Sequence, residues 1–458
     1  MGTKSLCFSS LLLCVFLLHI HLHKGVVVVV AQEIAGSESE ALGLARPERE
    51  AIEIIIGGGA GGGHGPAPSP ECPPPSPPPL SRLEKARRVL LKFKTSINDP
   101  KGYTRNWNQQ TDVCKFNGVR CARYPNTSES AVAGLDFNQA AISACGSAPL
   151  SLSGILDKIT ELTFFHVNSN NFSGAIPSQI TTYPYFFELD LSNNKLVGEF
   201  PKVVVQATKL VFLDLRFNNF HGPVPSQLFN MDLDVIFINN NQLCQNLPDN
   251  FGSTPARYLT FANNQFTGPI PKSIGNASKT LTEVLFLGNK FEGCLPYEIG
   301  YLQKAVVFDV SRNYLTGPIP YSFACLSKIQ FLNLAHNKFY GLVPDSVCML
   351  PGIRNNGNLS LSDNYFTEVG AECWKLIKSK VLDVSKNCIP GLPNQRSHQE
   401  CYEFLSKVKP CPNHEYLSYI PCKGHWEKQQ STIPVPQATA LPPEPVTYKS
   451  LKPHRLRL

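Results

Sequence analysis

The chain has 458 residues, of which 42% are hydrophobic and only 17% charged, with 32 glycines, 38 prolines and 15 cysteines. This apolar content excludes a globally disordered chain, and the length exceeds that of one ordinary compact domain. The 42 Lys and Arg residues against 35 acidic residues leave a formal net charge of +7. That charge is too dilute over this length to indicate a nucleic-acid-binding surface, so no nucleic-acid partner is expected.

The first 31 residues have the pattern of a secretory signal peptide. Lys4 precedes an apolar run at residues 11–18, and a second run at residues 26–30 ends at Ala31. His19 and Lys24 lie between the two runs, so neither run reaches the roughly 18 continuous apolar residues that a membrane span needs, and no later stretch does. We therefore expect a secreted chain, cleaved after residues 1–31, with no transmembrane segment.

Two segments are expected to be disordered, residues 32–80 and residues 426–458. The first contains a glycine-rich run at 57–63 and nine prolines between Gly65 and Leu80, a composition that favours polyproline II over a packed core. Cys72 lies among these prolines. Because 13 cysteines remain after residue 31, an odd number, we predict that Cys72 links two chains into a disulfide-bonded homodimer. A free or capped thiol is the alternative.

Residues 81–130 predict a cap at the N-terminal end of the folded region. Ser81 followed by Glu84 has the spacing of a capping box, and apolar residues among Arg and Lys predict an amphipathic helix over about residues 83–94. Cys114 and Cys121 follow the helix, and a disulfide between them would close this end of the structure.

From residue 131 to residue 390 the chain repeats itself. Residues 187–201 read FELDLSNNKLVGEFP and residues 212–225 read FLDLRFNNFHGPVP. A unit of about 24 residues cannot bury its Leu-x-Leu pair alone, so stacked neighbours must do so, which predicts a parallel-sheet solenoid. One degenerate copy comes first. Ten further copies align, at nearly regular spacing, on Asn170, Asn194, Asn218, Asn241, Asn264, Asn289, Asn313, Asn337, Asn364 and Asn387.

The residues that recur in each copy have structural roles in this interpretation. The asparagine amide can pair with buried main-chain groups of adjacent turns that would otherwise lack partners. In the following Gly-x-(Ile/Val/Leu/Phe)-Pro sequence, glycine tolerates strained dihedral angles and proline prevents a helix from starting. We therefore assign the repeated Asn, Gly and Pro residues to the fold and not to catalysis.

The repeated pattern Leu-x-x-Leu-x-Leu-x-x-Asn-x-Leu-x-Gly-x-Ile-Pro resembles the plant extracellular leucine-rich repeat. Residues 81–412 more specifically resemble the corresponding domain of the leucine-rich repeat extensins, through Asn106-Trp107, Gly118-Val119-Arg120-Cys121, Gly293-Cys294-Leu295-Pro296, and the segment from Asn387-Cys388-Ile389-Pro390 to Cys401. This resemblance implies an α/β leucine-rich repeat solenoid, a right-handed superhelix with a parallel concave sheet and capped ends. Its C-terminal cap would span residues 391–425. Extensin-bearing members carry a long Ser-Pro-Pro-Pro-Pro array after the repeats, and none follows here.

The same resemblance implies a function. Leucine-rich repeat extensins are secreted cell-wall proteins, and the family implies binding of basic, cysteine-containing signalling peptides of the rapid alkalinization factor type, in cell-wall integrity and growth. Cell-wall polymer is a further expected partner. Two alternatives stay open: a defence protein similar to polygalacturonase inhibitors, and a structural cell-wall protein.

The predicted peptide site lies on the concave sheet. Residues that flank each Leu-x-Leu pair point away from the core and have no evident duty in the fold. Acids mixed with aromatics would suit a cationic, partly apolar peptide. The predicted contacts are Asp190, Ser192, Asp214, Arg216, Phe217, Phe237, Asn239, Asp309, Ser311, Arg312, Asn333 and His336. The alternative is that the acids are merely solvated and the phenylalanines pack on neighbouring turns.

Secretion favours oxidised cysteines, but the sequence supports their pairing only locally. At the C-terminal end, Cys388 with Cys401, or Cys401 with Cys411, would close the solenoid. Cys294 and Cys325 are either bridged or simply buried. Cys-x-x-His spacings at residues 411–414 and 422–425 mimic zinc ligands, but the secreted context favours disulfides, so no metal is expected.

Two further predictions concern modification and catalysis. Four sequons make Asn126, Asn171, Asn276 and Asn358 candidate glycosylation sites. The histidines of the repeats are scattered, and no nucleophile elbow, metalloprotease or phosphate-loop motif occurs. We therefore expect neither an enzyme nor a cofactor.

Overall fold

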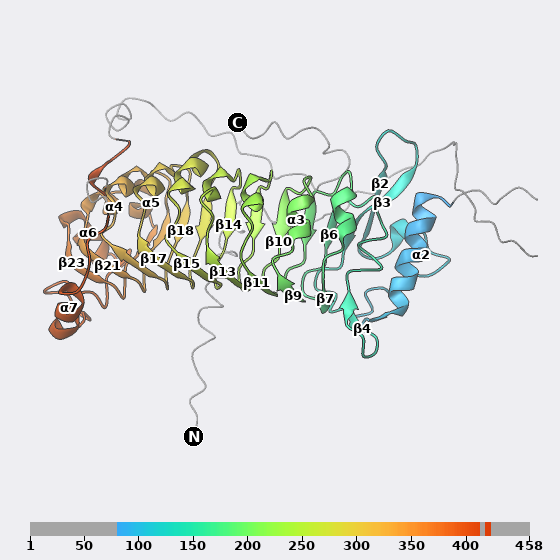
Figure 1. The fold of residues 1–458 in the computed structure, drawn as a ribbon, viewed down its shortest axis with the longest axis horizontal. Coiled ribbons are helices and arrows are strands. Elements are labelled where there is room, and N and C mark those ends of the chain that lie inside the picture. Colours follow the sequence, from blue (N-terminus) through green and yellow to red (C-terminus); the bar gives the residue numbers. More distant parts are fainter. Residues whose placement is uncertain (1–79, 413–416, 423–458) are drawn as a thin grey trace, which may run out of the picture.

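A computed structural model describes residues 80–412 and 417–422 of the chain. The predicted signal peptide, the Gly/Pro-rich segment with Cys72 and the C-terminal tail lie outside the described residues. The described part is one long, gently curved solenoid in which successive turns stack along a single axis (Figure 1). The predicted α/β solenoid of stacked repeats is confirmed.

One sheet runs the length of the solenoid on its concave face. Its first two strands pair antiparallel and all later neighbours pair parallel in chain order. This concave sheet consists of β2 (Val119–Arg123), β3 (Ser130–Asp136), β6 (Phe164–His166), β8 (Glu188–Asp190), β10 (Phe212–Asp214), β12 (Val235–Phe237), β14 (Tyr258–Thr260), β16 (Glu283–Leu285), β18 (Val307–Asp309), β20 (Phe331–Asn333), β22 (Asn358–Ser360) and β24 (Leu382–Asp383).

A second sheet of parallel strands follows the asparagine of each repeat. Figure 1 shows these strands as an evenly spaced row along one side of the solenoid. They are β5 (Leu150–Ser151), β7 (Phe172–Gly174), β9 (Lys195–Glu199), β11 (Asn219–Gly222), β13 (Gln242–Asn246), β15 (Gln265–Gly268), β17 (Lys290–Cys294), β19 (Tyr314–Gly317), β21 (Lys338–Val343) and β23 (Tyr365–Val369).

Short helices close each turn and return the chain to the concave sheet. Most of them follow a proline at the N-cap. Proline is tolerated at the start of a helix, but it has no N–H group to continue the preceding strand. They are η2 (Ser178–Thr182), α3 (Lys202–Gln206), η3 (Ser226–Asn230), η4 (Phe251–Ser253), η5 (Lys272–Lys279), η6 (Tyr297–Tyr301), η7 (Tyr321–Cys325), α4 (Asp345–Cys348), α5 (Pro351–Arg354) and α6 (Ala371–Lys378).

The core is a continuous apolar column between the two sheets and the helices. Alternate side chains of a strand face opposite sides, so the Leu-x-Leu pair points inward while its neighbours point outward. Leu213 and Leu215, for example, are buried, and Leu213 is paired in register with Leu189 and Ile236 of the adjacent strands. Each repeat thus covers the apolar side chains of the next, as the 24-residue period predicts.

The asparagine prediction is also confirmed. All ten aligned asparagines are buried. In one example, Asn218 Oδ1 accepts a hydrogen bond from Leu196 N at 3.0 Å, and its Nδ2 donates to Leu191 O at 2.9 Å and to Leu215 O at 3.1 Å. The glycine of the following bend adopts a positive φ, as at Gly198 (+114°) and Gly222 (+77°). These amides therefore tie each turn to the preceding one.

The N-terminal cap forms as predicted. Helix α2 (Arg82–Thr95) packs Leu90 and Phe93 against the first repeats, and the Ser81 hydroxyl accepts a hydrogen bond from Glu84 N at 3.2 Å. The Glu84 carboxylate instead lies 3.3 Å from Arg87 Nε, so only one half of the capping box is formed. The cap also contains β1 (Ile97–Asn98), η1 (Val113–Lys115) and β4 (Ser143–Ala144).

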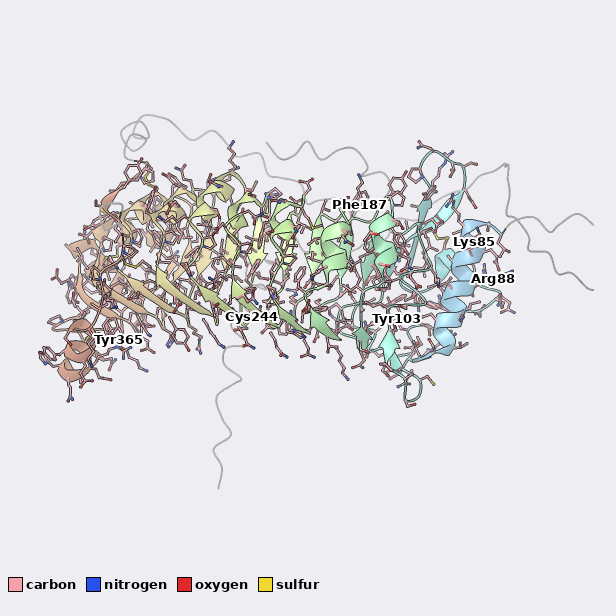
Figure 2. The ribbon with its side chains drawn as sticks, in the orientation of Figure 1. Lys85, Arg88, Tyr103, Phe187, Cys244 and Tyr365 are labelled. Atoms are coloured by element: carbon pink, nitrogen blue, oxygen red, sulfur yellow. A yellow bond between two sulfur atoms is a disulfide. The ribbon has the colours of Figure 1, made fainter. Side chains whose placement is uncertain are left out.

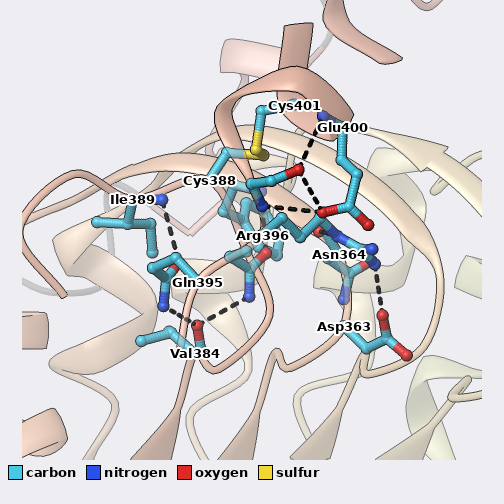
Figure 3. The surroundings of a disulfide bond; sticks show 12 residues. Asp363, Asn364, Val384, Cys388, Ile389, Gln395, Arg396, Glu400 and Cys401 are labelled. Atoms are coloured by element: carbon cyan, nitrogen blue, oxygen red, sulfur yellow. Dashed lines mark hydrogen bonds and ion pairs between the residues drawn. A yellow bond between two sulfur atoms is a disulfide. The ribbon is translucent and has the colours of Figure 1, made fainter. Parts of the chain in front are cut away.

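Two of the predicted disulfides are confirmed. Cys114 pairs with Cys121 in the N-terminal cap, and Cys388 pairs with Cys401 in the C-terminal cap. The second pair joins the end of the last repeat to α7 (His398–Leu405), whose N-terminus has a full capping box between Ser397 and Glu400 (Figure 3).

The alternative pairing of Cys401 with Cys411 is wrong. After α7 the chain turns back along the solenoid, and this returning segment (residues 408–412 and 417–422) carries Cys411 to Cys294 and Cys422 to Cys325. Cys294 and Cys325 are therefore bridged. These bonds also confirm the disulfide interpretation of Cys411 and Cys422 over zinc ligation.

Other contacts hold the returning segment against the repeats. The ring of Tyr419 packs edge-on against Tyr297 at 5.8 Å, and Tyr340 Oη lies 3.4 Å from Lys409 O. A fifth disulfide, which the sequence did not predict, joins Cys348 of α4 to Cys373 of α6. Four of the five disulfides thus secure the C-terminal half of the solenoid.

Candidate functional site

The predicted contact residues occupy two different places on the solenoid. Most lie on the concave sheet or directly after its strands, at the outward positions that flank each Leu-x-Leu pair. Three others lie in the tight turn before the buried asparagine, where Phe217, Arg312 and His336 have φ values of +53°, +56° and +55°. The turn residues line the edge of the sheet and are not part of its strands.

The sequence predicts that the aspartates of the concave sheet have no role in the fold. This prediction is wrong. The Oδ1 atoms of Asp190, Asp214 and Asp309 accept hydrogen bonds from the backbone N–H two residues further on, at 2.9, 3.1 and 2.8 Å. Such a bond holds the chain as it leaves the strand, a common role of aspartate in turns. The sequence pattern Leu-x-Leu alone does not reveal this bond.

Several of the predicted side chains are also buried. Asp214 is 0% exposed, and Asp309, Ser192 and Ser311 are buried too. The Ser192 hydroxyl donates to Asp190 Oδ1 at 2.5 Å, and Asn333 Nδ2 donates to Asp309 Oδ2 at 3.0 Å. The alternative that the acids are simply solvated is therefore wrong for Asp214 and Asp309, whereas Asp190 is half-buried. Neighbouring side chains cover most of these groups, although Asp214 Oδ2 accepts no hydrogen bond among the described residues.

Asp214 is the most enclosed acid of the face. Arg216 Nε lies 2.8 Å from Asp214 Oδ2, although not in a hydrogen-bonding direction, and the guanidinium lies over the Phe237 ring at 5.1 Å. Burial raises the pKa of Asp214 to about 8, against the opposing effect of Arg216. The predicted residues Asp214, Arg216 and Phe237 are thus brought together as one packed unit.

His166 forms a second unit on the strands before it. Its Nε2 lies 3.0 Å from Glu188 Oε2, and its ring packs against Phe164 at 4.8 Å. Burial acts to lower the pKa of His166, but the contact with Glu188 and the charge of Asp190 outweigh it, so the pKa is raised. The nearby hydroxyl of Ser192 donates to Asp190 and not to this imidazole.

Toward the C-terminal end, His336 is linked to the cap through Asp363. Its Nδ1 lies 2.7 Å from Asp363 Oδ2, while the other Asp363 oxygen contacts the Arg396 guanidinium (Figure 3). Burial acts to raise the pKa of Asp363, but the hydrogen bond with His336 and the charge of Arg396 outweigh it and lower that pKa. Arg396 also donates from Nε to Asn364 O at 2.7 Å and lies over the Tyr365 ring.

The prediction missed other outward residues of the same sheet. Phe164, Phe212, Tyr258, Glu283 and Phe331 are half-buried or nearly buried and lie in the register row one residue before the first leucine of the pair. The repeat alignment itself marks this row, two residues before Asp214 and its equivalents. The sequence therefore indicates that these residues point outward, but it does not indicate how far each of them is buried.

Other predicted sites can be placed on the solenoid. Asn126, Asn276 and Asn358 are exposed and Asn171 is half-buried, and Asn358 lies on β22 of the concave sheet. Within residues 80–412 and 417–422, no three His, Cys, Asp or Glu side chains are grouped to hold a metal ion. Helices in the same part of the chain are all too short or too polar to span a membrane.

The fold and the asparagine ladder define a leucine-rich repeat solenoid of the plant extracellular type. Residues 83–122 match the Leucine rich repeat N-terminal domain, and residues 209–231 and 256–277 match the Leucine Rich Repeat. The chain is 38% identical over 332 residues to leucine-rich repeat extensin-like protein 7 of Arabidopsis thaliana, which covers 72% of this chain and 74% of that protein. The chain belongs to the leucine-rich repeat extensin-like family.

Longer relatives match the same region. Leucine-rich repeat extensin-like protein 1 of Arabidopsis thaliana is 38% identical over 81% of this chain and 48% of its own length, and protein 2 is 40% identical over 50% of this chain and 29% of its own length. The chain thus spans half or less of these relatives. The predicted family resemblance is confirmed.

Solved structures share the fold. The ectodomain of the Arabidopsis receptor kinase HAESA, solved with the peptide hormone IDA, has a TM-score of 0.55 and 23% identity over 67% of this chain and 54% of that chain. A plant ice-binding protein has a TM-score of 0.55 and 24% identity over 69% of this chain and 100% of its own. At these identities the likeness concerns the fold alone.

Proposed function

We propose that this protein is a secreted cell-wall binding module for basic, cysteine-containing signalling peptides of the rapid alkalinization factor type, acting in cell-wall integrity and growth. The observation that carries the proposal is the composition of the concave face. Half-buried aromatic side chains, including Phe212 and Phe237, alternate there with acidic ones, including Asp190 and Glu283. Aromatic anchors beside acids suit a cationic, partly apolar ligand.

Two further observations support an extracellular binding role. The five disulfides between described residues indicate folding in an oxidising compartment. A solenoid of the same fold holds a peptide hormone in the HAESA ectodomain. Rigid stacking of the repeats also keeps the outward side chains of the concave sheet in a fixed arrangement, which lowers the entropic cost of binding.

The decisive experiment measures binding of the purified secreted chain to an oxidised peptide of this type by calorimetry. Phe237→Ala should weaken binding by about 2 kcal/mol, since Phe237 is an aromatic anchor of the face. Tyr314→Ala is the matched control, because Tyr314 is 52% exposed on the second sheet, away from the concave face. Equal affinities for wild type and Phe237→Ala would contradict the proposed face.

The two alternatives are outcomes of the same assay. A polygalacturonase-inhibitor-like protein would bind a pectin-degrading enzyme and not the peptide. A structural protein would bind cell-wall polymer alone. The peptide reduced and alkylated at its cysteines is the negative control, because it keeps the positive charge and loses the folded shape.

We also propose the homodimer linked through Cys72, which lies outside the described residues. Among the described cysteines, exposed Cys145 and half-buried Cys244 are free, the latter on β13 of the second sheet (Figure 2). Non-reducing electrophoresis should show a dimer in wild type and Cys145→Ser, and a monomer in Cys72→Ser. Loss of the dimer in Cys145→Ser instead would move the link to Cys145, and a monomeric wild type would end the idea.

A further inference from the structure

The middle of the concave sheet carries an apolar cluster separate from the main core. Its members come from consecutive repeats and stand at outward positions, where the strands before β14 place mostly polar side chains. Alternation along the strands keeps these side chains from reaching the core column. We call this group the concave apolar cluster; it consists of buried Ala262, Leu285 and Val307, with Leu287, Val306 and Phe331 packed against them.

Glu283 lies beside this cluster, on the same face. In the parallel register it is the direct neighbour of Val307 on β18 and of Tyr258 on β14, and Leu285 follows it on β16. No hydrogen bond or ion pair to the Glu283 side chain occurs among the described residues, and burial raises its pKa to about 7. A carboxylate that is partly desolvated and lacks a partner is unfavourable for the folded chain.

Three other acids of the face differ in this respect. Asp214 has Arg216, Asp309 has Asn333, and Glu188 has His166. Their second oxygens are therefore engaged within the protein, whereas the carboxylate of Glu283 is left for an external group. Leu287, Val306 and Phe331 are half-buried and leave apolar surface open on this face, and exposed apolar surface commonly marks an interaction site.

We propose that Glu283 and the concave apolar cluster form an anchoring subsite for a ligand segment in which a Lys or Arg stands next to an apolar side chain. The cation pairs with Glu283 while the apolar side chain covers the half-buried Leu287 and Phe331. This inference rests on the proposed peptide-binding function of the concave face. It adds the position on that face at which the ligand is anchored. Charge complementarity selects the occupant, because only a cation compensates the desolvated carboxylate.

The pairing makes binding depend on pH. Among titratable groups on the adjacent strands, Tyr258 lies beside Glu283, exposed Arg257 precedes Tyr258, and Asp309 lies beside Leu285; burial is the cause of the Glu283 shift. Below a pH of about 7 the Glu283 carboxyl is protonated and attracts a cation less. Affinity for a cationic ligand should therefore rise as the pH increases from 5 to 8.

The test uses the full chain and immobilised short peptides that present Arg, neutral citrulline or Glu between Leu and Phe. Wild type should retain the Arg peptide at least about tenfold better than the citrulline peptide at pH 8. Glu283→Gln should lose this preference and its pH dependence. Asp383→Asn is the matched control, because Asp383 is an exposed acid of β24 in the same sheet, distant from the cluster.

The outcomes separate this inference from the proposed function. No preference for Arg in wild type, or the same preference in Glu283→Gln, overturns the subsite, even where a signalling peptide binds elsewhere on the chain. Conversely, an Arg preference that depends on Glu283 supports the subsite even where the rapid alkalinization factor type of peptide does not bind. Phe331→Ser should also reduce retention. Should Phe331→Ser change only the melting temperature, the cluster has a structural role and the subsite is wrong.

Discussion

The two halves of the solenoid have the same repeat but use it differently. In the N-terminal half, from β6 to β12, the concave sheet carries charges that are paired within the protein, as in His166 with Glu188 and Asp214 with Arg216. In the C-terminal half, the sheet carries the concave apolar cluster and the unpartnered Glu283. The repeat fixes where a side chain stands, but its neighbours on adjacent strands decide whether it is available to a ligand.

The halves also differ in how they are held together. The N-terminal half has one disulfide across 7 residues, whereas the returning segment closes loops of 117 and 97 residues in the C-terminal half. A disulfide that closes a longer loop removes more conformational entropy from the unfolded chain, so the C-terminal bonds constrain the unfolded chain most. The half that presents the unpartnered acid is thus the more strongly cross-linked.

The largest expected difference concerns these cross-links. Removing the bond between Cys294 and Cys411 with a double Ser substitution should lower the free energy of unfolding by about 5 kcal/mol, and removing that between Cys114 and Cys121 by about 2.5 kcal/mol. Chemical denaturation of the two variants measures both values. Equal losses would mean that loop length does not set the contribution of these bonds.

The asparagine ladder offers a smaller effect that should be the same in both halves. Asn218→Ala and Asn313→Ala each leave buried main-chain groups without partners, as the matching hydrogen bonds of the two residues show. We expect a loss of about 1 to 3 kcal/mol in each variant. Thermal unfolding provides the measurement, with Lys195→Ala, an exposed side chain directly after a ladder asparagine, as control. Unchanged stability in both variants would contradict the ladder role.

The smallest expected effect is the pH dependence of the N-terminal half. Folding raises the pKa of Asp214 from 3.8 to about 8. The carboxyl group therefore binds a proton more readily in the folded chain than in the unfolded chain. Its contribution to stability is complete below pH 4 and is lost as the pH rises toward 8. Asp214→Asn should remove this decline and be more stable than wild type at pH 8 by at least about 1 kcal/mol.

The raised pKa of His166 acts in the same direction, because the paired imidazolium is lost as the pH rises. Comparing melting temperatures of wild type and Asp214→Asn across pH 4 to 8 separates the two groups, since His166 is present in both proteins. If the two curves are parallel, Asp214 is ionised throughout and its ion pair with Arg216 outweighs the effect of burial.

Sequence by itself determined the features that depend on local, repeated pattern. The period of about 24 residues, the buried asparagines, the glycine bends and the capping helix follow from short-range preferences and from the need of each repeat to bury its leucines on its neighbours. Cys114 with Cys121 and Cys388 with Cys401 belong to this group, because their partners lie only 7 and 13 residues apart. The outward positions were also readable from the alternation of the strands.

Only the tertiary structure decided the features that depend on distant neighbours. Cys411 pairs with Cys294 because the chain after α7 turns back along the solenoid, a path that no local pattern indicates. Asp214 is enclosed, while Glu283 has no side-chain partner in the part of the chain that the structure describes, although both stand outward on equivalent strands. The physical reason is that burial and pairing of a charge depend on which side chains the adjacent turns bring beside it, and these differ from repeat to repeat.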